Sequence, residues 1–155
     1  MDVIISALLD RLQAMHQSIE RALAGMPDEA MDWSPGPEMN SLGVLVAHTL
    51  GAERYWIGDV AGGSPSGRAR EAEFLTTGRS AESFISQAHE VLAYSKSVLA
   101  QLTPQEMAAI RMVRDSRQET VAWAILHALE HTAIHTGHIE ITRQLWDMRQ
   151  QKRRE

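Results

Sequence analysis

Four of the seven histidines in this chain of 155 residues lie within twelve positions, between His127 and His138. The apolar residues around them recur at three- and four-residue steps, which is typical of an α-helix. At about 100° per residue, the four histidines fall within about 80° of one helical face. Burying four imidazoles on one face is costly unless a metal ion or polar groups meet them. The cluster therefore requires a partner element that supplies either polar groups or metal ligands.

The rest of the chain also shows helical periodicity, interrupted by segments rich in glycine and proline. The pattern predicts four helices, at residues 2–24, about 41–60, about 80–102 and about 117–149. Residues 26–40 are predicted to form a loop with one turn at Pro27–Met31, and residues 109–115 an extended segment. Two capping boxes, Thr103–Glu106 and Ser116–Glu119, predict a short helical turn and the start of the longest helix.

Four helices of this length predict an all-α fold, a four-helix bundle in a single domain spanning 1–155. The connection 61–78 is long, polar and rich in helix breakers. A loop of this length is either functional or a crossover, and we interpret it as a crossover between helices that are not antiparallel neighbours. The loops 26–40 and 61–78 are expected to rim any cleft.

Composition and charge exclude several classes of protein. The chain is 44% hydrophobic and 23% charged, as expected of a globular protein, and its net charge of −5 argues against nucleic-acid binding. It has no cysteine, which excludes disulfides, thiolate nucleophiles and cysteine-ligated zinc. The longest uncharged apolar stretch, Leu42–Ala47, is too short for a membrane helix. No secretory signal is visible, so we expect a cytoplasmic protein without membrane partners.

Histidines one helical turn apart can direct two imidazoles at one metal ion. The spacing leaves three pairs open: 127/131, 131/135 and, at three residues, 135/138. Three histidines at successive turns would span about 12 Å, too far for one ion, so a third ligand must come from another helix. His48 is the best candidate, because it shares an otherwise apolar face with Tyr55. His16 and His89 have no partner at ligand spacing and are expected to face solvent or to pack.

Taken together, these segments resemble the DinB/YfiT-like metalloenzyme superfamily. The resemblance covers nearly the whole chain and is carried by the order and spacing of several short motifs. These are Trp33–Pro35, Asn40–His48, Glu53–Trp56, and His127–Ile139 followed by Arg143-Gln-Leu.

The resemblance implies a bundle with up-down-down-up helix order and a three-histidine metal site. Carried onto this sequence, the ligands are His48, His131 and His135. Position 138, often glutamine in the family, is His138 here, which implies a fourth imidazole near the metal. The resemblance also favours a homodimer.

Four further side chains are candidates near the metal. Tyr55 could hydrogen-bond a metal-bound group or simply pack, and Arg143 could reach an anionic substrate or snorkel. His127 and His138 are either groups that orient the ligands or groups that face the substrate. Glu130 is expected to be a solvated or inter-subunit charge. The tryptophans Trp56, Trp123 and Trp146 are expected to be core or dimer contacts.

Three neutral imidazoles leave coordination positions open, which is typical of a reactive site. Zn²⁺ and Ni²⁺ both suit such a donor set. Relatives in the superfamily include thiol-dependent S-transferases and a thiol-dependent maleylpyruvate isomerase. The resemblance therefore implies a low-molecular-weight thiol cosubstrate and a small electrophilic substrate. The alternatives are a hydrolase that uses metal-bound water, and a non-enzymatic, dimeric, metal-binding protein associated with stress.

Overall fold

The computed structural model describes residues 3–155, except for the side chain of Asp115. Its long helices are α1 (Val3–Leu23), α3 (Leu42–Glu53), α5 (Ala81–Leu99) and α7 (Val121–Lys152). α3 continues directly into a π-helical segment, Arg54–Ala61. The predicted all-α class is therefore confirmed, and the predicted helix 41–60 consists of α3 and the π-helical segment together.

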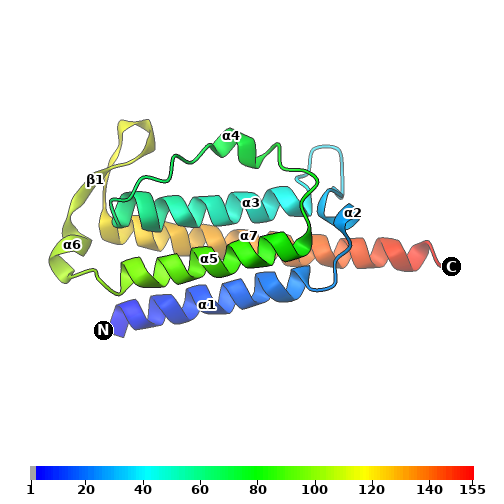
Figure 1. The fold of residues 1–155 in the computed structure, drawn as a ribbon, viewed down its shortest axis with the longest axis horizontal. Helices are drawn as coiled ribbons and strands as arrows, with labels where there is room; N and C mark the ends of the chain where they lie inside the picture. The colour runs from blue at the N-terminus through cyan, green and yellow to red at the C-terminus, as the bar shows by residue number, and fades with distance from the viewer. Residues whose placement is uncertain (1–2) are drawn as a thin grey trace.

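The four long helices form a bundle in which α7 packs against α1 and α3, and α5 packs against the same two. In Figure 1, α1 and α7 run from left to right, whereas α3 and α5 run from right to left. The connection after the π-helical segment therefore returns along the length of the bundle. It carries the short helix α4 (Arg70–Glu73), which lies against α3.

Two predicted turns are confirmed at the ends of the bundle. α2 (Asp28–Met31) follows α1, and α6 (Pro104–Ala108) follows α5. Thr103 and Glu106 form the expected capping box, each side chain bonding to the other residue's backbone N–H. The predicted extended segment contains β1 (Ile110–Met112), which pairs antiparallel with β2 (Gln118–Thr120).

The predicted capping box at Ser116–Glu119 is wrong. Ser116 lies in the 3₁₀ turn Arg114–Ser116 with a φ of 59°, and Glu119 pairs with Arg111 in the two-stranded ladder. The ladder holds this segment extended, so α7 begins four residues later than predicted, at Val121. Its N-cap is Thr120, whose hydroxyl accepts a hydrogen bond from the Trp123 N–H at 3.1 Å.

The interior consists of two apolar clusters with polar side chains between them. One cluster includes Ile19, Leu42 and Phe84, and the other includes Leu12, Ile57 and Ile125. On α1, α5 and α7 a buried polar residue, His16, Ser95 or Thr132 respectively, lies between positions of the two clusters. On α3, the buried Glu53 directly follows Ala52, which belongs to the second cluster. We call this level of the bundle the polar layer.

The polar layer contains one fully buried carboxylate, Glu53. His16 Nε2 lies 2.7 Å from one carboxylate oxygen of Glu53, and the Ser95 hydroxyl donates to the other at 2.8 Å. These three side chains are at most 3% exposed and come from α1, α3 and α5. His16 is thus one of the packing residues, and its hydrogen bond to the Glu53 carboxylate helps to tie three helices together.

Among residues 3–155, no helix combines the length and the apolar character required to cross a membrane.

The first prediction tests the start of α7. Thr120→Ala removes the capping hydroxyl and should lower the free energy of unfolding by about 1 kcal/mol, measured by urea denaturation. Thr120→Ser keeps the hydroxyl and should restore most of that loss. Ser116→Ala serves as the comparison at the wrongly predicted cap, and an equally large loss there would contradict the assignment of Thr120.

The second prediction concerns the polar layer. Glu53→Ala leaves His16 and Ser95 buried without their shared acceptor and should destabilise the protein by about 3–5 kcal/mol. Ser95→Ala removes a single hydrogen bond and should cost about 1 kcal/mol. Thermal or urea unfolding measures both, and equal losses in the two variants would show that the carboxylate is not the centre of this network.

Candidate metal centre

Three histidines converge where α3 packs against α7. His48 extends from α3, and His131 and His135 extend from successive turns of α7. One nitrogen from each histidine can be chosen so that all three lie within 4.8 Å of one another. The Nε2 atoms of His48 and His131 are 3.1 Å apart. Two nitrogens bound to one zinc ion at 2.0–2.1 Å in tetrahedral geometry lie about 3.4 Å apart, so this donor set fits a metal ion.

Local structure sets the direction of each imidazole. Ser41 caps α3 by accepting a hydrogen bond from the Val44 N–H at 3.2 Å, which fixes where the helix begins. α3 is buried at nearly every position, so its rotation about its axis is determined by packing on several sides. His131 and His135 lie one turn apart on α7, and their ring centroids are 4.4 Å apart.

Burial and neighbouring positive charge keep two of the imidazoles neutral. Burial and the proximity of His135, His48, His127 and Arg68 lower the pKa of His131 to about 3. Burial, with smaller effects from His48 and His138, lowers the pKa of His135 to about 4. Neutral imidazole is the form that binds metal, so both rings are ready as ligands at neutral pH. His131 Nδ1 is buried and has no hydrogen-bond partner among the described residues.

The sequence analysis did not identify two residues of this site, Arg68 and Glu73. Both lie in the 61–78 connection. Glu73 Oε2 is 2.9 Å from His48 Nδ1, and Arg68 binds the same carboxylate at both oxygens, at 2.5 and 2.7 Å. Burial opposes ionisation of Glu73, but hydrogen bonds from Arg68 and His48 outweigh it and hold the pKa of Glu73 below its usual value. The only signal in the sequence was the expectation that this long loop would rim a cleft.

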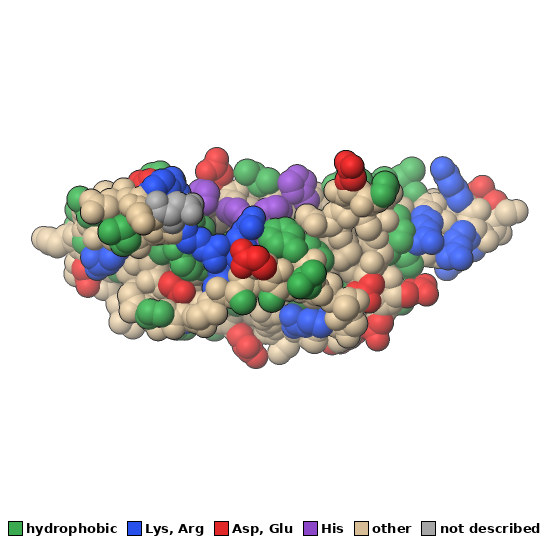
Figure 2. Space-filling model, turned by 90° about the horizontal axis from the view of Figure 1, so that it is seen from above, with side chains coloured by type: hydrophobic (Ala, Val, Ile, Leu, Met, Phe, Trp, Pro, Cys, Tyr) green, Lys and Arg blue, Asp and Glu red, His purple; other side chains and the backbone are tan. Residues whose placement is uncertain are grey.

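The connection also covers part of the histidine group. The Phe74 ring lies 4.9 Å from the His48 ring, and the Arg70 guanidinium lies 4.9 Å from the Phe74 centroid. Figure 2 shows histidine side chains at the surface of the molecule, beside lysine and arginine side chains. The site is thus covered on one side by the crossover and is open on another.

The structure places His127 and His138 differently from each other. His127 is stacked on Trp123 at 4.9 Å and meets the edge of Trp56 at 4.7 Å, so its ring belongs to an aromatic cluster next to the site. His138 is exposed, and its Nδ1 lies 3.3 Å from Nδ1 of His135. Of these two candidates, only His138 is in hydrogen-bonding distance of a residue of the three-histidine group.

Tyr55 and Arg143 are used in structural contacts. The Tyr55 hydroxyl accepts a hydrogen bond from the Arg114 N–H at 3.2 Å, which ties the π-helical segment to the hairpin turn. Arg143 donates to the carbonyl oxygens of Ala22 and Ala24 at the end of α1, at 2.8 and 3.1 Å. Its guanidinium also pairs with Asp147. These contacts favour packing for Tyr55 and a helix-capping role for Arg143 over direct roles in the site.

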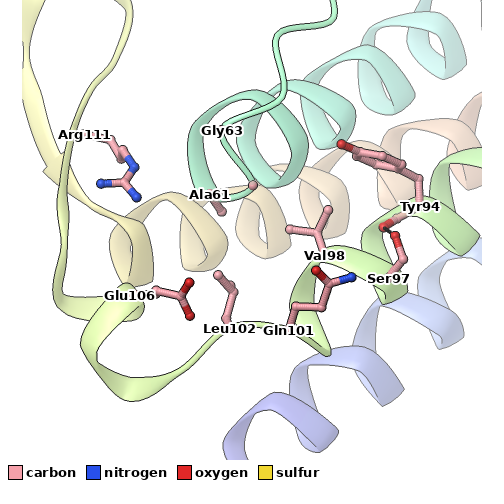
Figure 3. A pocket seen from close by; sticks show the side chains of 10 residues that line it. Ala61, Gly63, Tyr94, Ser97, Val98, Gln101, Leu102, Glu106 and Arg111 are labelled. Carbon is pink, nitrogen blue, oxygen red and sulfur yellow. Dashed lines mark hydrogen bonds between the residues drawn. The ribbon is translucent and has the colours of Figure 1, made fainter.

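The remaining candidates lie outside the site. His89 pairs with Glu20 at the surface, and Glu130 is an exposed charge 3.9 Å from His127. Trp146 is buried and packs edge-on against Trp33 with ring centroids 5.5 Å apart. A separate cavity of about 330 Å³ lies between the end of α5 and the hairpin. The side chains of Gln101, Glu106 and Arg111 line it (Figure 3). No histidine lines this cavity.

The fold and the site define the class of protein: a helical bundle with three histidines between two helices that could hold a metal ion. The family model for mycothiol-S-transferases matches residues 7–148. The chain therefore belongs to the mycothiol-S-transferase family, within the DinB/YfiT-like superfamily. No curated protein matches the chain significantly.

Several solved structures share the fold. A conserved protein from Enterococcus faecalis has a TM-score of 0.78 at 18% identity, covering 94% of this chain and 97% of that one. A DinB-like protein from Bacillus cereus has a TM-score of 0.72 at 16% identity, covering 90% of each chain. A DinB-like protein from Bacillus subtilis has a TM-score of 0.67 at 17% identity, covering 92% of this chain and 90% of that one. At these identities the likeness establishes the fold alone.

The third prediction concerns the stability of the metal-free protein as the pH falls. The pKa values of His131 and His135 in the folded state lie below the usual value of about 6.5, so the unfolded chain binds protons first. Stability should therefore fall as the pH decreases from about 6.5 toward 4. Each histidine contributes at most about 1.4 kcal/mol per pH unit, and less here because both rings are partly exposed.

Urea denaturation with a chelator present measures this slope between pH 7 and 5, above the range where most carboxylates titrate. The double variant His131→Asn/His135→Asn should have a flatter slope. His89→Asn, which changes an exposed histidine, should keep the wild-type slope. Equal slopes in the wild type and the double variant would contradict the prediction.

Proposed function

We propose that this protein is a metal-dependent S-transferase that uses a low-molecular-weight thiol, with His48, His131 and His135 as ligands of one divalent metal ion. The observation that supports this most is the convergence of three imidazoles from α3 and α7 in a chain of the mycothiol-S-transferase family. Zinc and nickel are the metals we propose, because both accept neutral imidazole ligands.

The chemistry follows from the donor set. Three neutral ligands leave the metal its full positive charge and an open position, so a thiol bound there would lose its proton at neutral pH. The chain contains no cysteine, so the sulfur nucleophile has to come from the cosubstrate. The thiolate sulfur would form a bond to an electrophilic carbon of the substrate while an epoxide C–O bond or an alkene π bond at that carbon breaks. The electron pair of the broken bond would stay on the substrate and be neutralised by a proton equivalent to the one that the thiol lost.

The chain's own residues would hold and orient this site. His48 is hydrogen-bonded to Glu73, and the apolar rings of Phe74, Trp56 and Trp123 lie close to the site or beside His127. His138, next to His135, is the exposed group best placed to accept or donate a proton near the open side. The aromatic rings beside the site favour an electrophilic substrate with apolar groups that can pack against them.

The carboxylate that contacts the three-histidine group is not free to act as the general base that the hydrolase alternative requires. The nearest carboxylate to the histidines, Glu73, is bound at both oxygens by Arg68 and also accepts from His48. A carboxylate held in this way is a poor proton acceptor for water. We therefore place thiol-dependent transfer ahead of hydrolysis.

The homodimer stays a prediction. Four large apolar side chains are exposed on one side of α7, at spacings of seven and eight residues: Leu126, Ile134, Ile141 and Met148. They lie within about 80° of one another around the helix, so they form a single stripe. This stripe is the surface at which we would look for the partner.

The fourth prediction tests the proposed function. Untagged protein should bind about one equivalent of zinc or nickel, measured by mass spectrometry of the metal content, and His131→Ala/His135→Ala should bind none. His89→Ala, an exposed histidine away from the site, should keep the metal. The metal-loaded wild type should transfer low-molecular-weight thiols to electrophiles such as epoxides or activated alkenes, while the double variant should be inactive.

Two results would contradict the proposal. Absence of metal in the wild type after incubation with zinc and nickel would remove the metal centre. Stoichiometric metal without turnover for any thiol, together with hydrolysis of esters or amides without thiol, would favour the hydrolase instead.

A further inference from the structure

We propose that Glu73 and Arg68, on the crossover connection, are positioning residues that fix the proton of His48 at Nδ1 and so present its Nε2 to the metal. This inference rests on the proposed metal centre. It assigns a role to the connection between the π-helical segment and α5 that no feature of its sequence indicated.

The first step is the direction of the hydrogen bond. Arg68 binds both oxygens of the Glu73 carboxylate, at 2.5 and 2.7 Å, and a carboxylate paired in this way is ionised. An ionised carboxylate only accepts hydrogen bonds, so the proton in the 2.9 Å contact with Glu73 belongs to His48 Nδ1. Arg68 Nη2 also lies 3.5 Å from that Nδ1, and because a guanidinium only donates, it could bond to Nδ1 only if that nitrogen were unprotonated. The contact with the ionised carboxylate is shorter, at 2.9 Å, and requires the proton on Nδ1.

The second step concerns the other side of the ring. With its proton at Nδ1, neutral His48 has a free lone pair at Nε2, the atom 3.1 Å from His131 Nε2. His131 must then be the donor in that contact, which agrees with the absence of any partner for its Nδ1 among the described residues. His48 is therefore already in the tautomer that a metal requires, whereas His131 has to move its proton when the metal binds.

The third step concerns the space beside α3 that the Glu73 carboxylate occupies. Gly51 lies on α3 almost one turn after His48, and a Cβ atom built there would collide with the Glu73 carboxylate and approach Arg68 Nε to 3.4 Å. The absence of a side chain at Gly51 lets the carboxylate reach His48. Arg68 and Glu73 are also only 8% and 11% exposed, so their pair is shielded from the solvent that would weaken it.

A carboxylate that orients a metal-ligating histidine typically changes metal affinity by about 10–100-fold when it is lost. The variants Glu73→Ala and Gly51→Ala should therefore each weaken zinc binding by roughly this factor, measured by competition with a chromophoric chelator. Glu73→Gln, which can still accept from His48, should lose less than Glu73→Ala.

Gly51→Ala also separates positioning from stability. Alanine within a helix is favoured over glycine by about 1 kcal/mol, so this variant should keep or raise the stability of α3 while it weakens metal binding. Gly137→Ala is the matched control, because it lies on α7 with nothing within 4 Å of an added Cβ. It should leave the affinity unchanged.

A second measurement does not need the metal. ¹⁵N NMR of metal-free protein distinguishes the two protonated forms of a neutral imidazole, and His48 should be protonated at Nδ1 in the wild type. In Glu73→Ala the protonation should shift toward a mixture of Nδ1 and Nε2. Unchanged zinc affinity in Glu73→Ala and Gly51→Ala, or unchanged NMR signals of His48, would overturn the proposal.

The two measurements also separate this proposal from the proposed function. Wild-type protein that binds no metal refutes the metal centre, and the NMR result on the same protein then decides the role of Glu73 by itself. Wild-type protein that binds metal, with variants that bind it equally well, refutes only the positioning role.

Discussion

The packing of α3 against α7 is the contact on which the candidate site depends. It brings His48 to His131 across 83 positions of sequence, and the two Nε2 atoms come within 3.1 Å. Neither helix could supply all three ligands by itself, because only two histidines on one helix, about one turn apart, can reach the same metal ion. The two apolar clusters fix the helices against each other, so the imidazoles are held where they could bind one metal ion.

The polar layer explains why such a site can exist in the middle of a bundle. Both oxygens of Glu53 are hydrogen-bonded, by His16 and Ser95, on the side of α1 and α5, while the three-histidine group lies between α3 and α7. Both groups are costly to bury unless paired. Glu53 has hydrogen-bond partners at both oxygens and His48 is paired with Glu73, whereas His131 Nδ1 has no partner among the described residues. The bundle therefore divides its interior into two apolar parts and one polar level that adjoins the candidate metal site.

The crossover connection joins the fold to the site. Because α3 and α5 run in the same direction in Figure 1, the chain must return along the bundle between them. The return path passes α3 at His48, where Arg68, Glu73 and Phe74 contact the ring or its hydrogen-bond partner. A topological requirement thus also provides a carboxylate and a covering ring for the histidine group.

The sequence by itself determined the helical class, the helix positions to within a few residues and, through the family resemblance, the three histidines that converge. The periodicity of apolar residues indicates which residues share a helical face, and this is enough to predict the helices and the histidine pairs one turn apart. It left the histidine pairs open, and it misplaced the start of α7 at Ser116, because strand pairing with β1 competes with a local capping pattern. Only the tertiary structure assigned Glu73 and Arg68 to His48, and Arg143 to the end of α1. Those contacts join residues from an irregular loop or a distant helix end, and no local spacing encodes which side chains meet when separate elements pack.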